Sequence, residues 1–167
     1  MSRHPSRSEP ERILVRLPNW LGDVAMSTPG LRALRAHHPR ARIVGHVTAP
    51  LAPLLEGHPA LDEVWPLPAD RRSPGAIRRE ARRIAAGRFD LGIAIPESVS
   101  AALLMRLGGV RCVVGHARDP LRRALLHRAV RPAGSGGRRR LVARERLVLE
   151  LMRAAGAPGD DARLELA

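Results

Sequence analysis

Lysine and tyrosine are absent from this sequence, and cysteine and aromatic residues are scarce. The single cysteine, Cys112, excludes an internal disulfide and a zinc site built from cysteines. The three aromatic residues, Trp20, Trp65 and Phe89, are fewer than a stacking platform for single-stranded nucleic acid normally carries. No apolar run approaches the roughly 20 residues of a membrane-spanning helix. Residues 1–10 lack the apolar stretch of a secretory signal, so we expect a cytoplasmic protein.

What the sequence does contain is enough apolar material for one domain. Of its 167 residues, 44% are apolar and 27% are charged, which excludes a fully disordered chain. The formal net charge is +13, carried entirely by arginine. Because alanine, arginine, glycine and proline are all abundant, part of this basicity reflects a biased composition. An anionic partner fits the remainder, but no nucleic-acid-binding motif is present, so nucleic acid is an unfavoured partner.

Short apolar runs alternate with helix-like segments along the chain. This alternation predicts an α/β fold with a Rossmann-like, mostly parallel sheet and helices on both faces. The expected strands are 12–17, 42–47, 63–67, 90–95 and 111–115, with a weaker sixth at 126–130. The expected helices are 23–37, 50–57, 74–86, 97–107, 119–125 and 138–155.

Proline and glycine set several expected boundaries. Thr28 before Pro29 is either an N-cap followed by proline, or the place where Pro29 kinks one longer helix that begins at Asp23. We expect residues 1–11 to form a disordered basic tail, residues 12–157 the domain, and residues 158–167 the start of a linker.

The first β–α turn reads LPNWLGD over residues 17–23. Ligands of open α/β sheets bind beside the carboxyl ends of the strands, so this turn is well placed. It is neither a dinucleotide fingerprint nor a phosphate-binding Walker loop. Gly22 permits a close turn, and Asp23 follows at a helix start. Its carboxylate is a candidate general base, although capping the helix is the more common role of such a residue.

Further candidates for the binding of an acceptor follow the first, fourth and fifth strands. Each also has an ordinary structural role as an alternative: turn formation, packing, capping or a solvated surface. These candidates are Asn19, Trp20, Gly22, Ser27, Thr28, Glu97, Ser98, Arg118 and Arg122. The run Arg138–Arg140 is the densest basic segment and is a weaker candidate for an anionic headgroup. The histidines show no metal-ligand spacing, so we expect no metal and no cofactor.

Residues 12–36 resemble the start of glycosyltransferase family 9, the ADP-heptose:lipopolysaccharide heptosyltransferases, and among these the type II enzymes in particular. Their sequence is RILVRLPNWLGDVAMSTPGLRALRA. The likeness continues through PRARI (39–43), LDEVWPL (61–67), FDLGIAIP (89–96) and GHARDPLRRALL (115–126), and covers about 12–157.

This resemblance implies the N-terminal, acceptor-binding half of a two-domain GT-B enzyme. It implies inverting transfer of heptose from ADP-heptose to the anionic inner core of lipopolysaccharide, with Asp23 as the general base. Most of the nucleotide sugar would be held by a C-terminal domain outside this chain, so the chain alone is expected to be incomplete. The enzyme would act in the cytoplasm, with peripheral contact at the inner membrane.

Two other functions stay open: a non-catalytic acceptor-binding remnant and a basic nucleic-acid-binding α/β protein.

Glu97 differs from the residue that the family usually has at this place. A carboxylate beside a phosphorylated acceptor would be repulsive.

Overall fold

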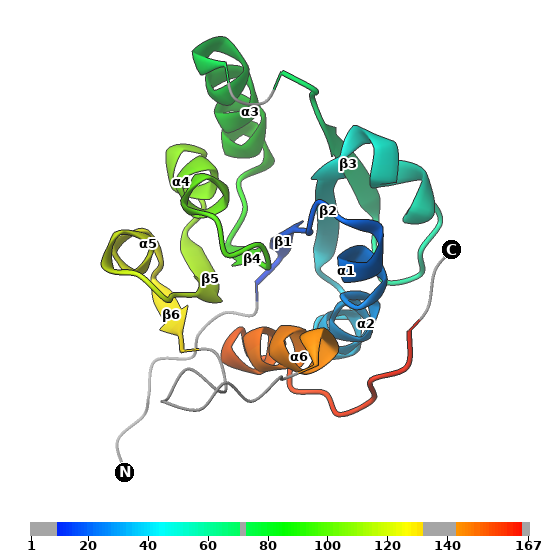
Figure 1. The fold of residues 1–167 in the computed structure, drawn as a ribbon. Helices are drawn as coiled ribbons and strands as arrows, with labels where there is room; N and C mark the ends of the chain where they lie inside the picture. Colours follow the sequence, from blue (N-terminus) through cyan, green and yellow to red (C-terminus); the bar gives the residue numbers. More distant parts are fainter. Residues whose placement is uncertain (1–9, 71–72, 132–142, 165–167) are drawn as a thin grey trace.

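The fold is a six-stranded, all-parallel sheet between two layers of helices (Figure 1). The structure, a computed structural model, describes residues 10–70, 73–131 and 143–164. The strand order is β3-β2-β1-β4-β5-β6. The strands are β1 (Arg12–Arg16), β2 (Arg42–Thr48), β3 (Glu63–Leu67), β4 (Leu91–Ala94), β5 (Cys112–His116) and β6 (Arg128–Val130). The predicted parallel sheet is confirmed, with strand ends that differ from the expected ones by one or two residues.

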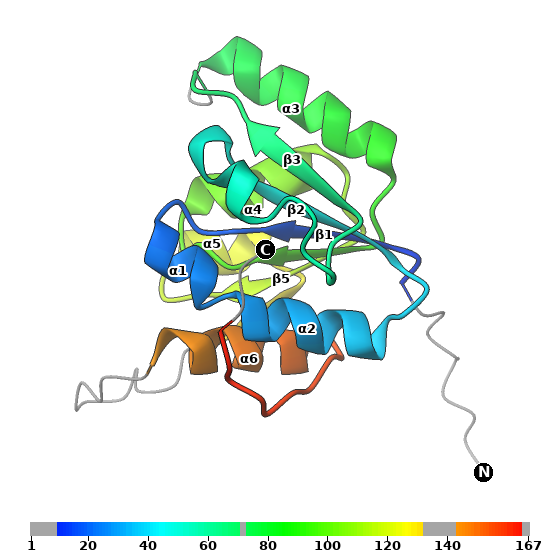
Figure 2. The same cartoon turned by 90° about the vertical axis from the view of Figure 1, so that its right-hand side faces the viewer.

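Helices cover both faces of the sheet, as predicted (Figures 1 and 2). One face carries α1 (Leu21–Ala25), α2 (Thr28–His37) and α6 (Arg144–Ala154), and the other carries α3 (Pro74–Gly87), α4 (Val99–Leu107) and α5 (Pro120–Leu125). The chain leaves β1 toward one edge of the sheet and leaves β4 toward the other. Because β–α–β crossovers share one hand, these two directions place α2 and α4 on opposite faces.

The helix expected at 23–37 is two helices. Helix α1 begins at Leu21 rather than Asp23, and α2 starts at Thr28 with Ser27 in the N-cap position. Pro29 lies in the first turn of α2, where its missing N–H has no cost. The alternative of one long helix kinked at Pro29 is therefore wrong, and the alternative of a new helix with proline in its first turn is confirmed, with the cap one residue earlier than expected. The segment expected as a helix at 50–57 is a 3₁₀ helix, η1 (Ala49–Leu54).

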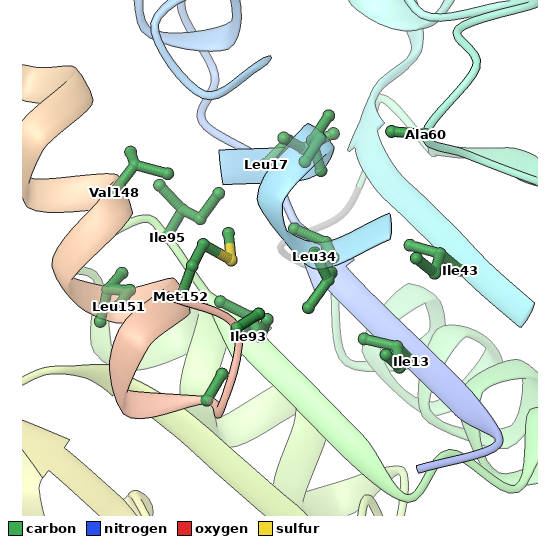
Figure 3. Packing of buried hydrophobic residues seen from close by; sticks show 14 of the residues in the cluster. Ile13, Leu17, Leu34, Ile43, Ala60, Ile93, Ile95, Val148, Leu151 and Met152 are labelled. Atoms are coloured by element: carbon green, nitrogen blue, oxygen red, sulfur yellow. The ribbon is translucent and has the colours of Figure 1, made fainter. Parts of the chain in front are cut away.

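The larger core lies between the sheet and the α1, α2 and α6 layer. Figure 3 shows Ile13 and Ile93 from the sheet and Ile95 just after β4 in one cluster with Leu34 of α2 and Met152 of α6. A smaller core fills the opposite face, where Leu14 of β1 meets α3 and α4. Successive β1 side chains thus alternate between two cores, which explains the continuous apolar run of this strand.

Helices α2 and α6 approach closely at Gly30. A Cβ placed on Gly30 would lie 2.5 Å from Val148 Cγ1 and 3.1 Å from Met152 Cε. The segment after α6 turns at Gly156, whose φ of 96° suits glycine, and runs back toward α2. There Asp161 pairs with Arg32 at 3.3 Å. Residues 158–164, expected as a linker, thus have contacts with the domain.

A buried histidine joins β2 to α3. His46 is 1% exposed, and its Nε2 lies 3.0 Å from Glu80 Oε1. Burial lowers the pKa of His46, and this effect is larger than the increase that the contact with Glu80 causes. Burial alone would raise the pKa of Glu80, but the hydrogen bond with His46 and the charge of Arg83 lower it. At neutral pH the pair is therefore a neutral imidazole that donates to a carboxylate.

Among the described helices, none combines the length and the apolar composition that crossing a membrane requires.

We expect Gly30→Ala to lower the free energy of unfolding by about 1–3 kcal/mol, because the added methyl group overpacks the contact between α2 and α6. Gly75→Ala is the matched control: it lies in the first turn of α3, and its Cβ would be 3.5 Å from an arginine side-chain nitrogen. The control should be neutral, or more stable by up to about 1 kcal/mol. Urea denaturation of both variants measures this. Equal stability of the two variants would contradict the close packing at Gly30.

We expect stability to depend on pH through His46. Its folded pKa lies below its ordinary value of 6.5, so the unfolded chain binds a proton more readily. The stabilisation is complete above pH 6.5 and is lost as the pH falls from there toward the folded pKa, by up to about 1.4 kcal/mol per pH unit. His46→Gln should reduce this slope, as measured by urea denaturation between pH 7.5 and 5. An unchanged slope in the variant would exclude His46 as its source.

Candidate functional site

The candidate site lies at the point in the sheet where the strand order changes direction: strands that follow β1 are added toward one edge, and strands that follow β4 toward the other. Strands β1 and β4 pair at the centre, and the chain continues from them toward opposite edges. The segments that follow these two strands therefore diverge at their carboxyl ends, which is where ligands of open α/β sheets bind. A cavity of about 440 Å³ opens at this point.

This cavity, called here the Asp23 cavity, brings together most of the candidate residues. Its lining comes from the segments after β1, β4 and β5 and from the start of α6. The lining residues are Pro18, Asn19, Trp20, Asp23, Ile95, Pro96, Glu97, Ser98, Arg118 and Arg144. Six of the ten candidates named from the sequence are among them. Of these, Trp20 is 77% exposed at the mouth, and Ser98 also caps α4 by accepting from the Ala101 N–H.

Asp23 directs its carboxylate at an arginine and does not cap a helix. The N-cap residue of α1 is Trp20, and no side chain caps that helix. Arg144 Nε lies 3.3 Å from Asp23 Oδ1, and Arg144 Nη2 lies 3.4 Å from Asp23 Oδ2. This two-point contact fixes the plane of the carboxylate. The capping alternative for Asp23 is therefore wrong.

Glu97 is the second carboxylate of the cavity. Its Oε2 lies 2.6 Å from Arg118 Nε, and its Oε1 lies 3.8 Å from Arg144 Nη1. Arg144 thus stands between two carboxylates. The four charged groups form one chain of ion pairs: Arg118, Glu97, Arg144 and Asp23.

Asn19 and Ser98 also line a second cavity of about 300 Å³ between α3 and α4. The walls of this α3–α4 cavity are largely apolar, with Leu67, Ile77 and Leu104 among them. Its polar side includes Arg16, which is 6% exposed and donates to Asn19 Oδ1 at 2.6 Å. Arg16 thereby orients an amide that both cavities share.

Four candidates lie outside both cavities: Gly22, Ser27, Thr28 and Arg122. Ser27 and Thr28 are fully buried, and their hydroxyls donate to the carbonyls of Asp23 and Ala25. Their hydroxyls are used inside the fold, which favours the structural alternative for both residues. Gly22 lies in α1, and a Cβ there would meet nothing within 4 Å, so this turn does not require glycine.

Arg122, a candidate for acceptor binding with a solvated surface as its alternative, is instead buried in the fold. It is 1% exposed, and its guanidinium donates to the carbonyls of His116, Ser98, Ala94 and Pro96. Burial lowers the pKa of Arg122, although Glu97 and Asp119 partly offset this effect. Arg122 therefore clamps the segment that carries Glu97 and Ser98 to the end of β5.

Arg144 is the site residue that sequence reasoning missed. It lies 121 positions after Asp23 and reaches the cavity because α6 returns to the face that carries α1 and α2. One arginine among many gives no local signal of this contact. The run Arg138–Arg140 lies outside the described residues.

His116, at the end of β5, is 2% exposed, and its Nε2 lies 3.8 Å from Glu150 Oε2. Burial lowers the pKa of His116 more than the carboxylates of Glu97 and Glu150 raise it. His116 does not line either cavity, so its place is structural.

We expect Arg122→Met to lower the free energy of unfolding by about 3 kcal/mol or more, because several buried carbonyls lose a charged donor. Arg123→Met is the control on the same helix; Arg123 is exposed, so its loss should change stability by less than about 0.5 kcal/mol. Chemical denaturation measures both. Similar, small effects in the two variants would show that the clamp contributes little.

Comparisons with known proteins find relatives both in sequence and in fold. No family model matches the chain. Lipopolysaccharide heptosyltransferase 2 of Escherichia coli K12 is 33% identical over 107 residues, which is 59% of this chain and 29% of that protein. The protein of the same name from Salmonella typhimurium LT2 is 34% identical over 95 residues, which is 56% of this chain and 27% of that protein.

Solved structures of heptosyltransferases and of a family 9 protein are also similar to this chain. The E. coli ADP-heptose lipopolysaccharide heptosyltransferase II is 25% identical with a TM-score of 0.69, over 92% of this chain and 45% of that one. A glycosyltransferase family 9 protein from Veillonella parvula has a TM-score of 0.76 at 22% identity, over 92% and 43%. The chain spans less than half the length of these relatives. In sequence and in fold, it is related to the heptosyltransferases of glycosyltransferase family 9.

Proposed function

We propose that this chain provides the acceptor-binding part and the general base of an inverting heptosyltransferase. The observation that carries the proposal is the Asp23 carboxylate, held by Arg144 in a cavity at the carboxyl ends of β1 and β4. The donor is ADP-heptose and the acceptor a saccharide of the lipopolysaccharide inner core, at the cytoplasmic face of the membrane. The similarity to named lipopolysaccharide heptosyltransferases supports both substrates.

The chemistry needs one proton transfer from the acceptor. An acceptor hydroxyl donates a hydrogen bond to the Asp23 carboxylate, and its oxygen attacks the anomeric carbon of the heptose. As that bond forms, the bond from the anomeric carbon to the phosphate oxygen of ADP breaks, and the proton passes to Asp23. Attack from the side opposite the leaving group inverts the configuration.

The role of Arg144 in this step is to orient the base. Its two-point contact holds the carboxylate plane, while the remaining lone pairs of Asp23 are available toward the cavity. Asn19, oriented by Arg16, supplies a second polar group beside it. These contacts come from two separate parts of the chain, the end of β1 with the turn after it and the start of α6, which meet at this cavity.

We propose that the groups that bind ADP-heptose lie outside residues 1–167. The relatives are more than twice as long as the matched region, which supports a donor-binding part beyond it. Transfer is therefore measured with the native polypeptide that carries these residues, purified from its own cells. A chain that binds acceptor but transfers no heptose, even with a donor-binding domain added, would instead be an acceptor-binding remnant.

We expect Asp23→Asn to lower kcat for heptose transfer by about 10²–10⁴-fold, because the amide cannot accept the proton. The KM for the acceptor should change much less, since the amide oxygen still accepts a hydrogen bond. Release of ADP from ADP-heptose in the presence of an inner-core saccharide measures both constants.

Asp160→Asn is the matched control, because Asp160 is 96% exposed and lies after α6. This control should transfer heptose at the wild-type rate. Wild-type kcat in Asp23→Asn would rule out Asp23 as the base.

A further inference from the structure

Both guanidinium groups that line the Asp23 cavity are already engaged by carboxylates. Arg144 uses Nε and Nη2 on Asp23, and its Nη1 lies 3.8 Å from Glu97. Arg118 places its Nε 2.6 Å from the other oxygen of Glu97. Two arginines and two carboxylates leave this lining with no net charge. The excess of positive charge in the whole chain is therefore not present in the lining of the Asp23 cavity.

Glu97 engages both arginines, and the backbone fixes its position. Arg122 donates to the carbonyls of Pro96 and Ser98, on either side of Glu97. Ser98 in turn caps α4. The Glu97 side chain is 26% exposed, so its carboxylate is held at the cavity wall rather than in solvent. The ion pairs in the cavity thus depend on a residue with little freedom to move aside.

In the neighbouring α3–α4 cavity, the charged lining residues are also engaged by other groups of the protein. Its charged lining residues, Arg16 and Glu80, are 6% and 7% exposed. Arg16 donates to Asn19 and to the His46 carbonyl, and Glu80 accepts from His46. Among the described lining residues, the remaining groups are the amide and hydroxyls of Asn19, Ser98 and Ser100 and an apolar wall.

A phosphate group would fit these surroundings poorly. It needs guanidinium or N–H donors without a competing anion, and here both guanidinium groups lie against carboxylates that repel a phosphate. A saccharide hydroxyl meets no such cost, because it donates to a carboxylate without displacing an arginine.

We propose that Glu97 is a specificity-determining residue: by holding Arg118 and Arg144, it keeps phosphate out of the Asp23 cavity and selects an unphosphorylated, hydroxyl-bearing sugar. The inference rests on the proposed function in one respect, namely that the acceptor binds in this cavity. It concerns the part of the acceptor that docks there, whatever charges the rest of the acceptor carries.

Titration with inorganic phosphate at fixed ionic strength tests the proposal. Binding is followed by the NMR signals of the Asn19 and Ser98 amides and the Arg118 guanidinium, which separates this cavity from other basic surfaces. Glu97→Gln should bind phosphate at these signals roughly tenfold or more tightly than the wild type, because it frees Arg118, removes the second carboxylate beside Arg144 and takes away a negative charge.

Glu56→Gln is the matched control, since it makes the same change in net charge at an exposed position outside both cavities. It should leave phosphate binding at the cavity signals unchanged. Adding Arg118→Gln to Glu97→Gln should abolish most of the gain. Thermal unfolding of each variant verifies that it is folded.

The proposal is overturned if the wild type binds phosphate at these signals as tightly as Glu97→Gln, or if Glu97→Gln gains no more than Glu56→Gln. With the native polypeptide, Glu97→Gln should also raise kcat/KM for a phosphorylated inner-core saccharide relative to its unphosphorylated form; an unchanged ratio counts against the proposal. Failure of the proposed function would appear instead as normal transfer by Asp23→Asn, which leaves the phosphate titration interpretable.

Discussion

The pairing of β1 with β4 is the contact on which the rest of the site depends. These strands are neighbours at the centre of a parallel sheet, and the chain moves away from them in opposite directions. Their carboxyl ends therefore lie side by side while the segments that follow diverge, which opens the cavity that holds Asp23 and Glu97. Both carboxylates owe their proximity to the strand order rather than to any direct contact between them.

Buried arginines keep this opening in shape. Arg122 and Arg16 are almost fully buried, and each donates to backbone carbonyls at the ends of strands. A buried guanidinium is tolerated only where its donors are satisfied, and carbonyls beyond the sheet ladder also need partners. Each arginine thus donates hydrogen bonds to backbone carbonyls at the strand ends, where the segments diverge. Arginines in this chain have at least two roles, as internal clamps and as members of the ion-pair chain in the cavity.

The charge of the chain and the charge of its site are different quantities. A net charge of +13 favours anionic partners in general, yet the lining of the Asp23 cavity balances two arginines against two carboxylates. The local balance decides what can dock beside Asp23, because charges at close range act more strongly than distant, screened ones. In the function proposed here, the general basicity attracts an anionic acceptor, while the cavity takes its hydroxyl groups.

The sequence by itself determined the alternation of strands and helices, the parallel sheet and the turn that carries Asp23, because apolar periodicity and the proline and glycine boundaries are local signals. Six of the candidate residues did reach the cavity, since each follows a strand that ends at the same edge. Only the tertiary structure decided that Arg122, Ser27 and Thr28 are buried and that Arg144 pairs with Asp23. Side-chain burial and a contact across 121 positions depend on how the layers pack, and no short stretch of sequence encodes that packing.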